Sequence, residues 1–108
     1  MIWNKLESIA DLEDAIKKSH DSNILLFKHS TRCSISTTAL SRLERSWQEN
    51  GTIPYFLDLL NHRDISAAIE TTLGVQHQSP QAIVVKDGKS IYDASHMMIN
   101  AKQILSIG

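Results

Sequence analysis

The feature that most constrains the fold is a run of consecutive aliphatic and aromatic residues, Ile24-Leu25-Leu26-Phe27. Successive side chains of a strand point to opposite faces, so a strand that is apolar at every position is buried on both faces. Such strands are typical of parallel sheets that helices cover on both sides. The run therefore predicts the central strand of an α/β domain.

Helical and strand periodicities around this run indicate a βαβ unit followed by a hairpin. The expected elements are a helix over residues 9 to about 19, the central strand, a helix over 33–49, a strand over 55–60, a helix that Gly74 ends, a hairpin that turns at Asp87-Gly88, and a short last helix capped by Asn100 and Gln103. We therefore expect a mixed sheet of about four strands flanked by helices, with residues 1–108 forming a single domain.

Composition narrows the partners and the compartment. Hydrophobic residues make up 42% and charged residues 21% of the chain, which is ordinary for a globular protein. The 11 basic and 12 acidic residues leave a net charge of −1, so we expect neither nucleic acid nor a membrane as a partner. The N-terminus shows no signal-peptide pattern, and Cys33 is the only cysteine. These features favour a soluble protein of the reducing cytoplasm.

Cys33 is the candidate catalytic residue because it follows a polar segment at the junction between the central strand and the next helix. An unperturbed thiol is only about 3% ionised at pH 7, and the thiolate is the reactive form. The partial positive charge of a helix N-terminus stabilises that anion. Hydroxyl groups of Thr31 and Ser36 and positive charge on Arg32 or His29 are the further candidates for this task. The five histidines show no metal-ligand spacing beside the cysteine, so no metal site is expected.

The order of the expected elements resembles the thioredoxin fold over the whole chain. The segment from Lys28 to Ser36, Lys-His-Ser-Thr-Arg-Cys-Ser-Ile-Ser, resembles the monothiol bacilliredoxins of the YtxJ type. Ser34 departs from that family, which usually has proline after the active cysteine. Ser34 restores a backbone donor beside the sulfur and makes the start of the helix less rigid. The resemblance also implies that the Ser79-Pro80 bond is cis and faces Cys33, with Ser79 exposing its backbone to an extended substrate.

The resemblance implies a monothiol oxidoreductase. The spacing from Cys33 to Ser36 is C-x-x-S, so no second thiol is available to resolve a mixed disulfide. In this family, the active cysteine takes bacillithiol from S-bacillithiolated proteins, and a second bacillithiol regenerates the enzyme. S-bacillithiolated proteins would thus be the partners and bacillithiol the thiol co-substrate.

Two other functions are compatible with the sequence. Monothiol glutaredoxins that carry an iron–sulfur cluster also use C-x-x-S, but Ser34-Ile35 stands here where they usually have Gly-Phe. The second alternative is a thioredoxin-like binding module, in which the cysteine does not turn over. Anaerobic absorbance would identify a cluster carrier, and an ordinary alkylation rate at Cys33 would identify a binding module.

Overall fold

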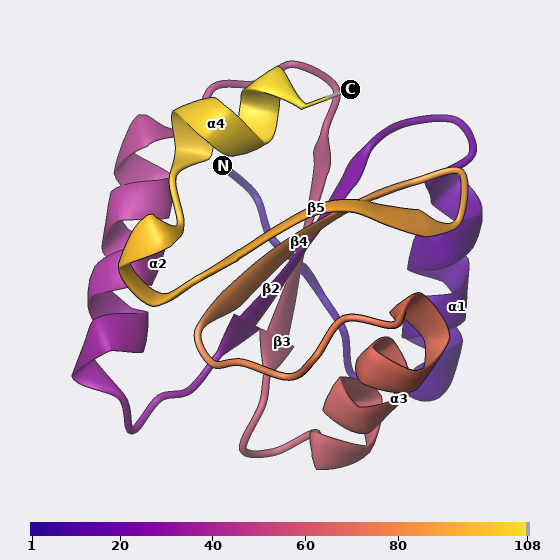
Figure 1. The fold of residues 1–108 in the computed structure, drawn as a ribbon, viewed down its shortest axis with the longest axis horizontal. Coiled ribbons are helices and arrows are strands. Elements are labelled where there is room, and N and C mark those ends of the chain that lie inside the picture. The colour runs from indigo at the N-terminus through magenta and orange to yellow at the C-terminus, as the bar shows by residue number, and fades with distance from the viewer. Residues whose placement is uncertain (108) are drawn as a thin grey trace.

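A five-stranded mixed sheet forms the centre of the molecule (Figure 1). The structure is a computed structural model that describes residues 1–107. The strands lie in the order β1-β3-β2-β4-β5, with the bounds β1 Asn4–Lys5, β2 Ile24–His29, β3 Ile53–Asp58, β4 Gln81–Lys86 and β5 Lys89–Ser95. Because β2 pairs in parallel with β3 and in antiparallel fashion with β4, it occupies the middle of the sheet. The predicted central strand is confirmed.

Helices cover both faces of the sheet (Figure 1). One face packs against α1 (Ile9–Lys18) and α3 (Arg63–Leu73), and the other against α2 (Ser34–Ser46) and α4 (Ala101–Ser106). Strand β2 contributes to both cores, since Ile24 and Leu26 pack under α1 and α3 whereas Leu25 and Phe27 pack under α2 and α4. A short 3₁₀ helix, η1 (His96–Met98), links β5 to α4 and packs against α2.

The local signals for turns and helix ends act as expected. The Ser8 hydroxyl accepts the N–H of Asp11 at the start of α1, and the Asn100 side chain accepts the N–H of Gln103 at the start of α4. Gly74 ends α3 in the left-handed conformation, with φ of 69°. Asp87 and Gly88 both have positive φ in the turn of the β4–β5 hairpin, as a type I′ turn requires.

The bounds of α2 and β3 and the number of strands differ from the sequence-based expectation. α2 ends at Ser46 instead of continuing to residue 49, because Trp47 adopts extended backbone and packs its ring against the core. β3 ends at Asp58 instead of residue 60, because its partner β2 ends at His29, which pairs with Asp58. The fifth strand, β1, is an exposed two-residue segment without a hydrophobic pattern.

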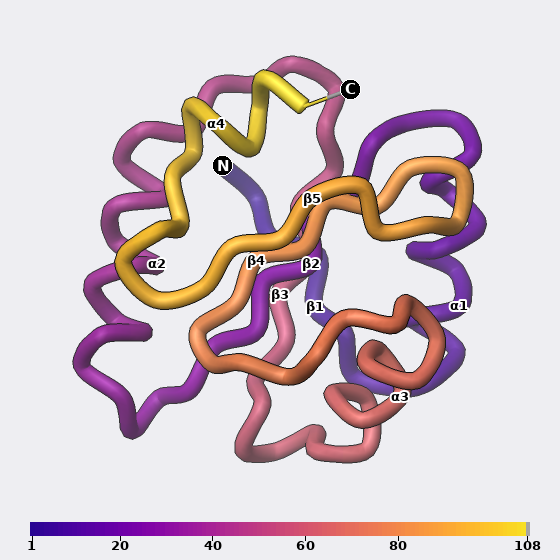
Figure 2. Tube along the Cα trace, in the orientation of Figure 1, coloured from indigo at the N-terminus to yellow at the C-terminus, as the bar shows by residue number. Residues whose placement is uncertain are grey.

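The N-terminus and helix α4 lie away from the start of α2 (Figure 2). The Asn23 side-chain amide, just before β2, donates to the carbonyl of Ile107 and so ties the C-terminal segment to the opposite end of the sheet. None of the helices within residues 1–107 is long and apolar enough to cross a membrane.

Candidate active site

Cys33 lies where the chain leaves β2 and enters α2. It is the N-cap residue of α2, with extended backbone, and its free thiol is half-buried. The preceding turn is closed by the Cys33 N–H, which donates to the carbonyl of Ser30 at 3.2 Å. The Cys33 carbonyl in turn accepts the N–H of Thr37 at 3.1 Å. These backbone hydrogen bonds hold Cys33 at the N-terminus of α2.

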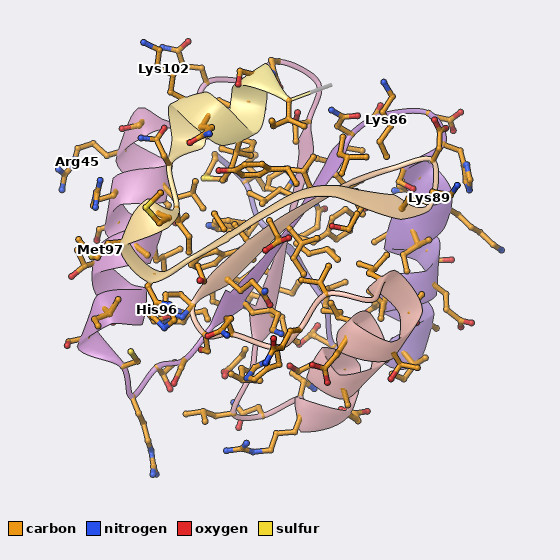
Figure 3. The ribbon with its side chains drawn as sticks, viewed as in Figure 1. Arg45, Lys86, Lys89, His96, Met97 and Lys102 are labelled. Carbon is orange, nitrogen blue, oxygen red and sulfur yellow. The ribbon has the colours of Figure 1, made fainter. Side chains whose placement is uncertain are left out.

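The segment before β4 reaches the same end of the sheet. The Ser79-Pro80 peptide bond is cis, as expected, and Pro80 is buried. Lys28, near the end of β2, is in register with Gln81 at the start of β4, which places Pro80 beside the strand end that leads to Cys33. The N–H of His96 donates to the Pro80 carbonyl at 3.1 Å. Figure 3 shows His96 between α2 and the start of β4, where its backbone adopts a left-handed φ of 54°.

Ser36 is fully buried beneath the loop between β2 and α2, and its hydroxyl contacts two residues, Ser30 and His29. Its Oγ accepts the N–H of Ser30 at 3.0 Å and lies 2.7 Å from Nδ1 of His29. A hydroxyl has one proton to donate, and donating it to Nδ1 satisfies both partners. In that arrangement, neutral His29 carries its hydrogen on Nε2. Within residues 1–107, Ser36 makes no hydrogen bond to the Cys33 sulfur, which was its expected role.

His29 is buried between aromatic rings on the α2 face of the sheet. Its ring lies 5.4 Å from that of Phe56 and 6.1 Å from that of Phe27, measured between centroids. Burial lowers the pKa of His29, and the negative charges of Asp58 and Glu44 oppose this shift. His29 is therefore predominantly neutral at neutral pH and does not supply a full positive charge to the cysteine.

The remaining predicted residues lie on the open side of the loop. Thr31, Arg32 and Ser34 are exposed, and none of them makes a side-chain hydrogen bond to another residue of the described chain. Ser34 and the two residues after it are the first three of α2, and no side chain caps this turn within residues 1–107. The backbone N–H groups of a first helical turn have no partner within the helix and are suited to an anion. Arg32 and Ser34 remain candidates for contacting substrate.

A buried lysine is the main feature of this region that sequence reasoning did not assign. Lys28 is fully buried on the α3 face, and its Nζ lies 2.6 Å from Nδ1 of His77. Burial lowers the pKa of Lys28 to about 8, with Glu70 opposing the shift. Glu70 also accepts the backbone N–H of His77 at 2.7 Å. These contacts anchor the segment that leads to Ser79. The only sequence signal was a lysine that directly follows the apolar run.

Apolar side chains are exposed on α2 and on η1, which packs against α2. Ile35, in its first turn, is 41% exposed, and Met97 and Met98 of η1 are 59% and 71% exposed. Figure 3 shows Met97 beside α2. A separate cavity of about 730 Å³ lies between the second half of α2 and α4, and Cys33 is not one of its lining residues.

The βαβ unit, the hairpin, the cis-proline and the N-cap cysteine together define a thioredoxin-like oxidoreductase fold. A solved structure described as an oxidoreductase with a thioredoxin fold is 30% identical to this chain, with a TM-score of 0.82, and the match covers 93% of this chain and 88% of the other. The family model of the monothiol bacilliredoxin BrxC matches residues 4–104. The chain belongs to the monothiol bacilliredoxin family.

Thioredoxins share the fold at lower identity. Fasciola hepatica thioredoxin is 20% identical with a TM-score of 0.73, and the match covers 94% of this chain and 91% of that one. Trypanosoma brucei brucei thioredoxin is 14% identical with a TM-score of 0.75, with coverage of 96% and 85%. At these identities the similarity extends to the fold alone. The expected thioredoxin-like fold is confirmed.

Proposed function

We propose that this protein removes bacillithiol from S-bacillithiolated proteins by thiol-disulfide exchange at Cys33. The observation that carries the proposal is the combination of one half-buried thiol at the N-cap of α2 with a serine, Ser36, at the fourth position of the motif. A chain with one thiol has to return it to the reduced state with an outside molecule. Membership of the bacilliredoxin family supports bacillithiol as that molecule.

In the first step, the Cys33 thiolate attacks the bacillithiol sulfur of the mixed disulfide. The sulfur–sulfur bond of the substrate breaks, a bond between Cys33 and bacillithiol forms, and the target cysteine leaves as a thiolate that takes up a proton. The free N–H groups at the start of α2 stabilise the attacking anion. A helix N-terminus contributes roughly 0.3 to 1 kcal/mol at exposed sites and up to about 2 kcal/mol where it is partly buried.

In the second step, the thiolate of a free bacillithiol attacks the bacillithiol sulfur on Cys33. Bacillithiol disulfide leaves, and Cys33 returns as a thiolate. The cycle therefore converts one S-bacillithiolated protein and one bacillithiol into one free protein thiol and one bacillithiol disulfide. Such a cycle requires a supply of reduced small thiol, for which we propose the cytoplasm as the compartment.

Exposed side chains of α2, of η1 and of the segment before Cys33 suit a varied set of target proteins. Met97 and Met98 are flexible and polarisable, and exposed methionines adapt to differently shaped partners. Ile35 adds an apolar contact in the first turn of α2. Arg32 offers a cation to an anionic group of bacillithiol or of the target.

A burst experiment tests the proposal. An S-bacillithiolated protein is supplied in excess over the enzyme, and its free thiol is followed with and without added bacillithiol. Without bacillithiol, we expect a burst of at most one target thiol per Cys33 and then arrest, because the capped cysteine has no resolving thiol. With bacillithiol, release continues. Intact-mass measurement of the arrested enzyme should find one bacillithiol on Cys33.

Two outcomes contradict this cycle. Sustained turnover without any external reductant excludes the monothiol mechanism. Absence of a burst, together with cluster absorbance in anaerobically purified protein or an ordinary alkylation rate at Cys33, assigns the chain to a cluster carrier or to a binding module.

A further inference from the structure

We infer that Ser36 is a positioning residue, whose buried hydroxyl holds the loop of Cys33 in its reactive geometry through His29 and Ser30. Ser36 occupies the position at which a dithiol enzyme carries its second cysteine. Because its hydroxyl hydrogen-bonds Ser30 and His29, Ser36 has a structural role here besides leaving the motif without a second thiol. The inference concerns the nucleophile of the proposed function, but its main measurements do not require bacillithiol.

The hydroxyl of Ser36 connects the end of β2 to the first turn of α2. It accepts the N–H of Ser30 at 3.0 Å, and the carbonyl of the same residue accepts the N–H of Cys33 at 3.2 Å. Both the N–H and the carbonyl of Ser30 are thus hydrogen-bonded. One side leads to the buried hydroxyl, and the other leads directly to the nucleophile.

His29 anchors the other end of this connection. Its ring is only 6% exposed, and its backbone carbonyl accepts the N–H of Leu59 at 2.9 Å. The ring bonds Ser36 Oγ through Nδ1 at 2.7 Å. Ser36 therefore links the loop of Cys33 to His29. The backbone of His29 is itself held by its hydrogen bond to Leu59, the residue after β3.

A hydroxyl serves both partners at one atom, because its oxygen accepts the Ser30 N–H and also hydrogen-bonds Nδ1 of His29. Alanine would leave the Ser30 N–H and His29 Nδ1 without their partner in a buried place. Cysteine would offer a weak donor and a weak acceptor. A threonine keeps the hydroxyl. The loss of the hydroxyl should free Ser30 and loosen the turn that places Cys33 at the N-terminus of α2, which slows the reaction of the thiol.

The test compares Ser36→Ala, Ser36→Thr and His29→Phe with the unchanged protein. His29→Phe removes Nδ1 while it keeps an aromatic ring against Phe27 and Phe56. We measure the rate of Cys33 alkylation by iodoacetamide against pH, and the hydrogen exchange of the Ser30 amide. Ser36→Ala should speed this exchange about tenfold or more, as the loss of a buried hydrogen bond predicts. It should also slow alkylation of Cys33 at pH 7 and change the dependence of the alkylation rate on pH.

Control variants make the result specific. Ser36→Thr should restore both measurements to near the original values, and Ser41→Ala, which removes an exposed hydroxyl from the same helix, should change neither. The effect of Ser36→Ala combined with His29→Phe on alkylation and on exchange should be smaller than the sum of the two single effects, because each single change breaks the same contact. Nitrogen NMR should find Nδ1 of His29 without a hydrogen in the unchanged protein.

An unchanged alkylation profile in both Ser36→Ala and His29→Phe, with faster exchange at Ser30, would overturn the inference, since Ser36 would then stabilise the loop without affecting the thiol. If Ser36→Ala does not fold, His29→Phe and Ser36→Thr decide the question. The proposed function is tested separately, because a protein with no bacillithiol burst can still show the Ser36 effect on alkylation. A normal burst with no Ser36 effect refutes only the present inference.

Discussion

Lys28 and His29 are consecutive residues of β2 that fasten two different loops on opposite faces of the sheet. On the α2 face, His29 bonds Ser36 and fastens the loop that carries Cys33. On the α3 face, Lys28 bonds His77 and fastens the segment that leads to Pro80. Alternation along one strand thus lets its last two residues support both sides of the site.

The two contacts differ in charge. The pair of His29 and Ser36 is neutral, and the hydroxyl also accepts a backbone N–H, so its hydrogen-bonding capacity is used. Lys28 carries a charge into a fully buried place, where one neutral imidazole is its hydrogen-bond partner within residues 1–107. Burying an ammonium group is costly, which is why the pKa of Lys28 falls to about 8. We expect the loop of Cys33 to be insensitive to alkaline pH, and the segment before Pro80 to depend on it.

The largest expected effect is that of Cys33→Ala, because both loops act on the reaction through this one thiol. We expect complete loss of exchange with S-bacillithiolated protein and of alkylation. The free energy of unfolding should change by less than about 1 kcal/mol, since the side chain is half-buried and makes no hydrogen bond within the described chain. Exchange above the uncatalysed rate in this variant would show that Cys33 is not the reacting group.

The second effect is a gain of stability at alkaline pH that depends on Lys28. The pKa of this lysine is about 8 in the folded protein and about 10.5 in the unfolded chain, so the unfolded chain binds more protons between these values. Stability therefore rises as the pH increases from about 8 to about 10.5, by at most about 3 kcal/mol. The rise should be absent in Lys28→Met, which keeps an apolar stem in the same place.

Urea unfolding at several pH values measures this difference. At pH 7, Lys28→Met should be at least as stable as the unchanged protein, because replacing a buried charge with an apolar side chain is often neutral or stabilising. His29→Phe serves as the matched control on the other face and should retain the alkaline rise. An equal rise in Lys28→Met would show that other groups produce it.

The comparison also shows where sequence reasoning succeeds. The apolar run of β2, the glycine that ends α3 and the Asp87-Gly88 turn are local signals, and each one produced the predicted element. The position of Cys33 at the start of α2 followed from its place between the strand and the helix. These features depend on residues that are close together in the chain.

Contacts between distant residues could not be predicted in this way. His77 lies 49 positions after Lys28, and no periodicity relates the two. The hydroxyl of Ser36 was one of several candidates for stabilising the thiolate, and only the packing of α2 on β2 shows that it bonds His29 and Ser30. Strand β1 escaped prediction because it is held by pairing with β3 and has no apolar pattern of its own.

The smallest expected effect is that of Lys28→Met on the pKa of His77. It tests whether the contacts on the two faces of the sheet are independent. Burial lowers the pKa of His77, the positive charge of Lys28 lowers it further, and Glu70 opposes the shift. Lys28→Met removes the charge and leaves the burial, so the pKa of His77 should rise. The pKa of His29, which burial lowers on the other face of the sheet, should stay where it is.

An NMR titration of the two imidazole rings measures both values in one sample. The stability curve should change in the same sense. Because the folded protein holds both histidines at a lowered pKa, the unfolded chain takes up protons first as the pH falls below about 6.5, and stability is lost. A higher pKa of His77 in Lys28→Met makes this acid loss shallower. A shift of His29 as large as that of His77 would mean that charge on the α3 face reaches across the sheet, and the two contacts would then not be independent.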